Sequence, residues 1–81
     1  SKDWMKARAE AQLLATWLNT VSGKLSMGTH LNSAIYGGLE TVGEAIAYCE
    51  DILMNSSSTF HDYEEVNTIC DNINNGVGII G

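Results

Sequence analysis

The sequence contains no proline, and few of its segments alternate apolar and polar residues as strands do. A sheet-based fold would need such alternating segments, so the pattern predicts an all-α chain. The sequence also lacks an apolar run near the ~18 residues that a membrane-spanning helix requires. We therefore expect no membrane insertion.

Basic residues are scarce, because four Lys and Arg stand against ten Asp and Glu, for a net charge of −6. The charge is uneven: residues 1–23 sum to +1, whereas residues 24–81 carry one cation against eight carboxylates and sum to −7. An acidic domain repels nucleic acid backbones and anionic lipid headgroups. Neither nucleic acid nor a membrane surface is an expected partner.

Sequence motifs that mark an active site are missing. There is no Gly-x-Ser-x-Gly elbow and no Gly-x-x-x-x-Gly-Lys phosphate loop. We expect neither His30 nor His61 to join a helical metal face, so no zinc site is predicted. Calcium could meet Asp51, Asn55 and Asp62 near one turn, but no EF-hand loop can be written there, and water-exposed carboxylates at helix ends are the favoured interpretation. The chain is thus predicted to be non-enzymatic, with no cofactor and no bound metal.

The first helix, over about residues 3–22, is indicated by apolar residues that alternate steps of three and four. Its stripe consists of Trp4, Ala7, Ala11, Leu14, Leu18, Val21 and Leu25. Leu13 and Trp17 widen the stripe to about half of the helix circumference, so we expect it to face the core and contact two neighbouring helices. Gly23 ends the helix, since glycine readily adopts the left-handed conformation.

Two more helices follow, over about residues 42–54 and 59–74. Thr41 and Glu44 have the form of a capping box, in which each side chain binds the other's amide. The predicted core stripes of the two helices are Val42, Ile46, Cys49 and Leu53, and then Tyr63, Val66, Ile69, Cys70 and Ile73. The 81 residues are therefore expected to form a single domain, a three-helix bundle with a long ordered crossover over residues 24–40.

The crossover is long for a compact domain, and ordered long loops often carry binding sites. Met27, His30, Leu31 and Tyr36 are its candidate binding residues for a protein or ligand. The alternative is that its apolar residues close the base of the helical core, with a short helical turn over residues 31–36. Exposure of Tyr36 and Met27 distinguishes the two interpretations.

Cys49 and Cys70 lie on the apolar stripes of consecutive helices, so they are candidates for a disulfide. A hairpin centred near Ser57 would instead place Cys49 opposite Glu65 or Val66, about one helical turn away from Cys70. Two buried free thiols are the other interpretation, and the sequence leaves both open. Nearby, Asn55-Ser56-Ser57 forms an N-glycosylation sequon in an expected exposed turn.

Several segments resemble small helical modules of large exported microbial surface proteins: Leu13–Asn19, Ser22–Leu25, Thr41–Ile46 and Ile73–Ile79. The resemblance implies an extracellular or cell-surface location and an accessory role, and it transfers no site residues. A chain that opens at Ser1 is also expected to be a piece of a longer protein.

These observations predict a non-enzymatic extracellular structural or spacer module whose partners are neighbouring domains of the same chain or another protein. The alternative is a binding module that uses the crossover. Homo-oligomerisation is a third expectation, through Trp4, Met5 and the Ile79-Ile80 tail, which look too apolar for the ends of a monomer.

Overall fold

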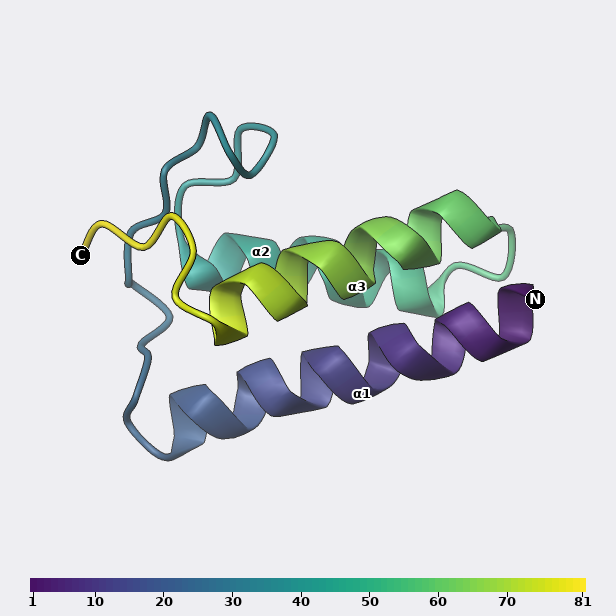
Figure 1. The fold of residues 1–81 in the computed structure, drawn as a ribbon, viewed down its shortest axis with the longest axis horizontal. Helices are drawn as coiled ribbons and strands as arrows, with labels where there is room; N and C mark the ends of the chain where they lie inside the picture. Colours follow the sequence, from purple (N-terminus) through teal and green to yellow (C-terminus); the bar gives the residue numbers. More distant parts are fainter.

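The computed structural model describes residues 1–81 as three helices without a strand. Helix α1 spans Lys2–Val21, α2 spans Val42–Met54 and α3 spans Phe60–Asn74 (Figure 1). These bounds lie within one residue of those expected from the sequence, and the predicted all-α three-helix fold with a long α1–α2 crossover is confirmed.

The crossover and the C-terminal tail share one end of the bundle, and the link between α2 and α3 lies at the other end (Figure 1). As a result α1 and α3 run in the same direction, while α2 runs back between the two ends. The two chain termini lie at opposite ends of the long axis, which extends over 35 Å.

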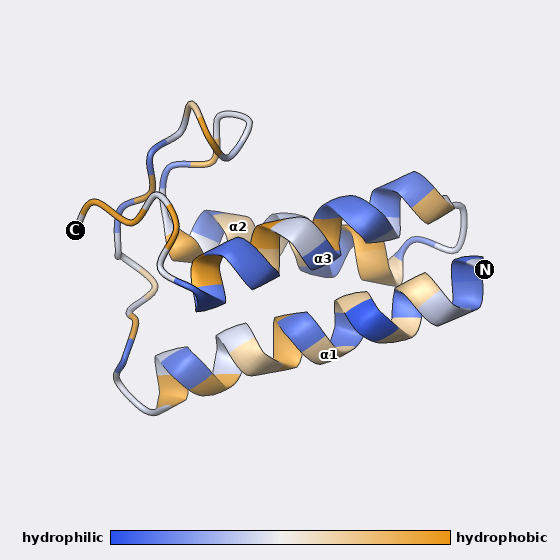
Figure 2. Cartoon of the chain, viewed as in Figure 1, coloured by the Kyte–Doolittle hydropathy of each residue, from blue (hydrophilic) through white to orange (hydrophobic).

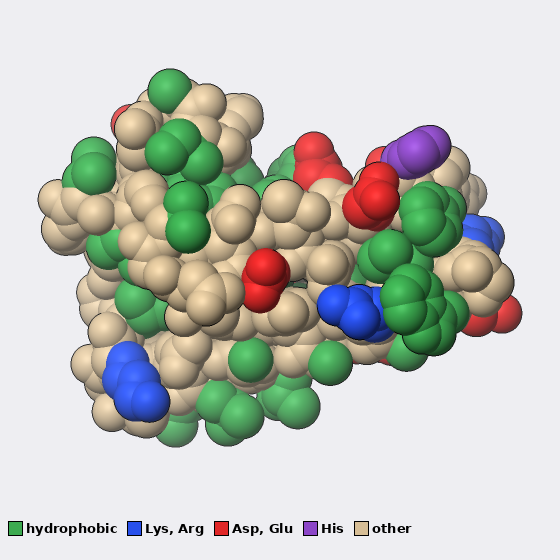
Figure 3. Space-filling model, in the orientation of Figure 1, with side chains coloured by type: hydrophobic (Ala, Val, Ile, Leu, Met, Phe, Trp, Pro, Cys, Tyr) green, Lys and Arg blue, Asp and Glu red, His purple; other side chains and the backbone are tan.

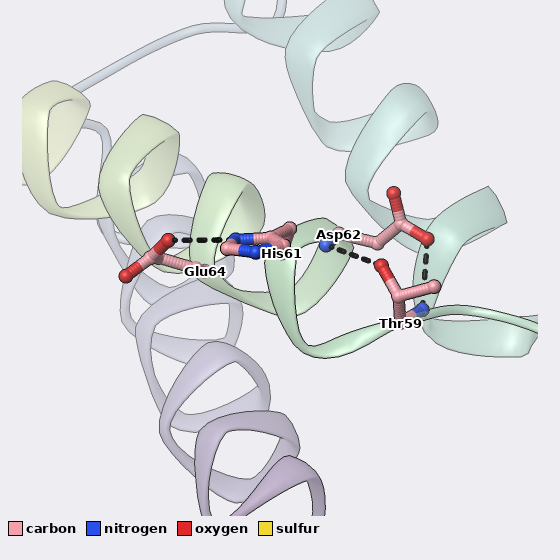
Figure 4. Close-up of polar contacts among 4 residues, drawn as sticks. All are labelled: Thr59, His61, Asp62 and Glu64. Carbon is pink, nitrogen blue, oxygen red and sulfur yellow. Dashed lines mark hydrogen bonds and ion pairs between the residues drawn. The ribbon is translucent and has the colours of Figure 1, made fainter.

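Threonines cap the starts of α2 and α3. Thr41 Oγ1 accepts from the Glu44 amide at 3.1 Å, as expected. The Glu44 carboxylate, however, accepts from the Glu40 amide at 3.0 Å, so the reciprocal half of the predicted capping box is wrong. The complete box is at α3, where Thr59 and Asp62 each bind the other's amide (Figure 4).

The core contains the predicted stripes of α2 and α3. All five predicted residues of α3 are buried, as are Val42, Ile46 and Cys49 of α2, while Leu53 packs partly buried at the edge. Hydrophobic and hydrophilic residues alternate along both helices (Figure 2), and the buried hydrophobic residues of each form one face. The 3.6-residue period was sufficient to identify that face.

The predicted core face of α1 is wrong. The buried residues of α1 are Met5, Ala9, Leu13 and Thr16. Leu13, on the flank of the predicted stripe, is buried, and Trp17 and Leu25 pack against the core as predicted. The other six residues of the stripe point to solvent, and we call them the outer face of α1: Trp4, Ala7, Ala11, Leu14, Leu18 and Val21. Ala9 and Leu18 are nine residues apart, a rotation of about 180°, so the two sets lie on opposite sides of the helix.

Polar contacts with α3 and α2 fix this orientation of α1. Asn74 of α3 bonds Gln12, Thr16 and Asn19 of α1, and the Trp17 indole donates to Glu50 of α2 at 3.2 Å. If α1 were rotated so that its outer face met the core, the side chains of Asn74 and Glu50 would lose their partners, because the outer face carries no polar side chain.

The crossover is held by backbone hydrogen bonds rather than by a helix. The Leu31 amide donates to Glu40 O at 2.9 Å, and residues 33–38 form turns in place of the predicted helical turn. The tail pairs with the same segment, since the Asn32 amide donates to Gly78 O at 2.7 Å. Gly78 has φ +67°, and a Cβ there would meet the Tyr36 ring at 3.0 Å, so this position requires glycine.

Candidate interaction surfaces

The outer face of α1 is an apolar row that the fold leaves uncovered. Leu14 is 59% exposed and Leu18 57% exposed, and Trp4 and Val21 extend the face to both ends of the helix. Figure 3 shows hydrophobic side chains along the lower edge of the molecule, which is the side of α1 away from α2 and α3. Scattered single apolar residues are ordinary on surfaces, whereas a continuous row over one helix marks an interaction site.

The structure does not bring the four predicted crossover residues together on a surface. Leu31 and Tyr36 are buried and belong to the core, while Met27 and His30 are exposed. Tyr36 donates its hydroxyl to Val77 O in the tail, and Leu31 pairs with Ile79. The tail and the helices therefore cover Leu31 and Tyr36, whereas Met27 and His30 stay accessible, and binding through the crossover stays a prediction.

A hollow of about 380 Å³ lies between the crossover and the helices α2 and α3. Ile35 and Leu39 line it from the crossover, and Tyr48 and Glu65 line it from α2 and α3. The Tyr48 hydroxyl donates to the Glu65 carboxylate. That hydrogen bond, helped by partial burial and by the charge of Glu65, raises the pKa of Tyr48 to about 12.

The Tyr48–Glu65 hydrogen bond leads to a prediction for the titration of tyrosine at alkaline pH. Glu65→Gln is expected to bring the pKa of Tyr48 down toward 10.0, its ordinary value, because the carboxylate no longer holds the phenolic proton. Since the pKa is higher in the folded chain, the contact stabilises the fold below pH 10 and this contribution is lost as the pH rises toward 12. The ultraviolet absorbance of tyrosinate, followed against pH, measures the shift.

The matched control is Glu64→Gln, on the neighbouring position of α3, whose carboxylate contacts His61. It should leave the Tyr48 titration unchanged. Equal tyrosine titration curves for the native chain and Glu65→Gln would contradict the assignment.

Cys49 and Cys70 are brought together in the core. Their Sγ atoms lie 3.8 Å apart as free thiols, and both side chains are at most 1% exposed. The one-turn mismatch expected from a simple hairpin is wrong, because the link from Asn55 to Thr59 is extended at both ends and shifts α3 along α2. Contact with Cys70 and burial raise the pKa of the Cys49 thiol.

The link between α2 and α3 contains the sequon, and the residues considered for calcium lie in the link and in the adjoining turns of α2 and α3. Asn55 is exposed, so the expected glycosylation site lies in an exposed link, and its modification remains a prediction. Asp51, Asn55 and Asp62 do line one hollow. However, Asn55 Oδ1 accepts from the Ser57 amide and Asp62 Oδ2 from the Thr59 amide, so both oxygens have backbone partners.

The two histidines are far apart in the fold. His30 Nδ1 lies 3.3 Å from the Gly81 carbonyl oxygen in the tail. His61 pairs with Glu64 at 3.4 Å, one turn further along α3 (Figure 4). This pair is the helical spacing that we did not expect for His61, and both residues are largely exposed. No group of three His, Cys, Asp or Glu side chains is placed to hold a metal ion.

The surface expected for homo-oligomerisation is not formed. Trp4 lies near the N-terminus and the Ile79-Ile80 tail lies at the opposite end of the bundle (Figure 1). Met5 is buried, and Ile79 packs against the core while Ile80 is exposed. Of these residues, Trp4 belongs to the outer face of α1. Sequence reasoning found the residues of that face but assigned them to the interior.

Comparison of the chain with protein-family models, curated proteins and solved structures finds no match. The resemblance to helical modules of exported surface proteins therefore stays a prediction. None of the three helices combines the length and the apolar character needed to cross a bilayer.

Proposed function

We propose that this domain is a non-enzymatic structural module that spaces neighbouring domains of an extracellular or cell-surface protein. The observation that carries the proposal is the placement of the two termini at opposite ends of a 35 Å bundle (Figure 1). A domain with this geometry holds its N-terminal and C-terminal neighbours apart. A domain whose termini lay close together would instead project from the side of the chain without separating its neighbours.

Both ends of the chain are attached firmly to the bundle. Helix α1 begins at Lys2, capped by the Ser1 hydroxyl, so the chain enters directly as a helix. At the other end the Ile80 amide donates to His30 O at 2.9 Å, and the Tyr36 hydroxyl holds Val77 O. These contacts support a spacer that fixes a distance, because both ends of the described chain are tied to the bundle.

The histidine and carboxylate contacts near α3 also support a structural role. His61 and Glu64 are neighbours within one helix, and Thr59 and Asp62 close the start of that helix (Figure 4). Such contacts stabilise helix ends and do not converge on a common point where a substrate could react.

The experiment is a distance measurement between fluorescent dyes attached beyond each terminus. A spacer should give one narrow distribution of distances. Tyr36→Phe should broaden it, because removal of the hydroxyl frees the tail at Val77 and costs about 1 kcal/mol of hydrogen bonding. Tyr48→Phe is the matched control, since its hydroxyl donates to Glu65 of α3 and has no hydrogen bond to the tail.

A broad distribution in the native chain would contradict the proposal. Binding through the 24–40 crossover stays the alternative, supported by the exposure of Met27 and His30 and weakened by the burial of Leu31 and Tyr36.

A further inference from the structure

The outer face of α1 has the geometry of a coiled-coil seam. Its residues alternate steps of three and four over the whole helix, which places them at the a and d positions of a heptad. The large members of the row are 56–78% exposed, and the structure has no segment left to cover them. A second helix packed along the row would bury every residue of it.

The sizes of these residues are self-complementary when two copies of α1 run antiparallel. Trp4 then meets Val21 of the second copy, Ala7 meets Leu18, and Ala11 meets Leu14. Every layer joins a larger residue to a smaller one, which keeps the helix separation uniform. A parallel pair would put alanine against alanine in two layers and leucine against leucine in the next two, so the helices would have to diverge.

The charges and helix dipoles of α1 are compatible with the antiparallel pair. All five charged residues of α1 lie in its first half, and residues 11–21 carry none. An antiparallel partner presents its uncharged half to the charged half. The two helix dipoles also run in opposite directions, so the N-terminus of each helix lies beside the C-terminus of the other.

We propose that the occupant of the outer face of α1 is a second copy of this chain, with the two α1 helices antiparallel. A two-stranded seam of this length buries on the order of 1,000 Å² in total, at the lower bound for a specific interface. The dimer is consequently weak, and it forms where the local concentration of the chain is high.

This association goes beyond the spacer role and does not depend on it. The outer face of α1 runs along the side of the bundle, so pairing leaves both termini free (Figures 1 and 3). Two spacers joined in this way would bring two parent chains side by side. Distance measurements within one chain test the spacer, and sedimentation tests the dimer, so either can fail alone.

Sedimentation equilibrium over a wide concentration range measures the dimer dissociation constant. Leu14→Glu should raise it at least tenfold, because the new carboxylates would be buried near the centre of the seam. Met54→Glu is the matched control: Met54 is 84% exposed at the end of α2, off the seam, and its replacement should leave the constant unchanged. Circular dichroism should show native helicity in both variants, since neither side chain is in the core.

Cross-linking tests the direction of the helices. An equimolar mixture of Ala7→Cys and Leu18→Cys should form a disulfide between unlike chains under mild oxidation, whereas Ala7→Cys alone should not. Mass spectrometry locates the bond, which separates it from the buried native thiols.

Three results would overturn the proposal. The first is a native chain that stays monomeric up to millimolar concentration. The second is a cross-link in Ala7→Cys alone, which indicates parallel helices. The third is binding to lipid vesicles, abolished by Leu14→Glu, without self-association.

Discussion

Mild oxidation is expected to join Cys49 to Cys70 and to raise the free energy of unfolding by about 3 kcal/mol. The Sγ atoms are already 3.8 Å apart and face each other across α2 and α3, so a small side-chain rotation brings them to the ~2.05 Å of a disulfide. The bond would close a loop of 21 residues and remove conformations from the unfolded chain.

Thermal unfolding of the oxidised and reduced chains measures this effect. For a domain of this size the midpoint should rise by roughly 12–24 °C, and the mass should fall by two hydrogens per chain. The reaction should be slow, because both thiols are buried and the oxidant reaches them only when the core opens.

Cys49→Ala is the control, since it removes one sulfur and should show no midpoint change between oxidising and reducing conditions. An oxidised native chain that unfolds at or below the temperature of the reduced chain would contradict the prediction. A disulfide is the state expected in an oxidising compartment. Its presence in protein isolated from the natural source would therefore support the proposed extracellular location.

The sequence predicted α2 and α3 correctly because each has a single apolar face. In α3 the row from Tyr63 to Ile73 has polar residues on the opposite side, so the 3.6-residue period leaves one choice for the core. The starts of these helices could also be predicted from the sequence, since the Thr41 and Thr59 side chains accept from backbone amides three residues further along.

Helix α1 could not be oriented from its sequence because apolar residues follow helical spacing on both of its sides. The outer face is the more apolar one, and the inner face includes Thr16, which is fully buried. Only contacts with residues far away in the sequence, chiefly Asn74, identify the inner face. The same limit applies to Cys49 and Cys70, whose proximity depends on how the link of residues 55–59 offsets two helices.

Asn74→Ala is expected to lower the free energy of unfolding by about 2–3 kcal/mol. The Asn74 amide donates to Gln12 O at 3.2 Å and to Gln12 Oε1 at 3.1 Å. Its oxygen accepts from the Thr16 hydroxyl at 2.9 Å and from the Asn19 amide at 3.1 Å. One side chain thus uses both donors and both acceptor sites to bind α1 to α3.

Denaturant unfolding measures this cost, and Asn75→Ala is the matched control. Asn75 is the next residue and is exposed, and its side chain bonds only Asp71 within the same helical turn. Its replacement should cost below about 1 kcal/mol. Equal destabilisation by the two alanines would show that the loss reflects the end of α3 and not the contact with α1.

A double-mutant cycle with Thr16→Val separates the orientation of α1 from general packing. If Asn74 and Thr16 act together, the double variant should lose less stability than the sum of the single variants, with a coupling of about 1 kcal/mol or more. The consequence extends to the surface: the outer face of α1 is the more apolar side and would otherwise compete for the core. The contacts of Asn74, together with the Trp17–Glu50 hydrogen bond, keep that face outside, where a second helix can reach it.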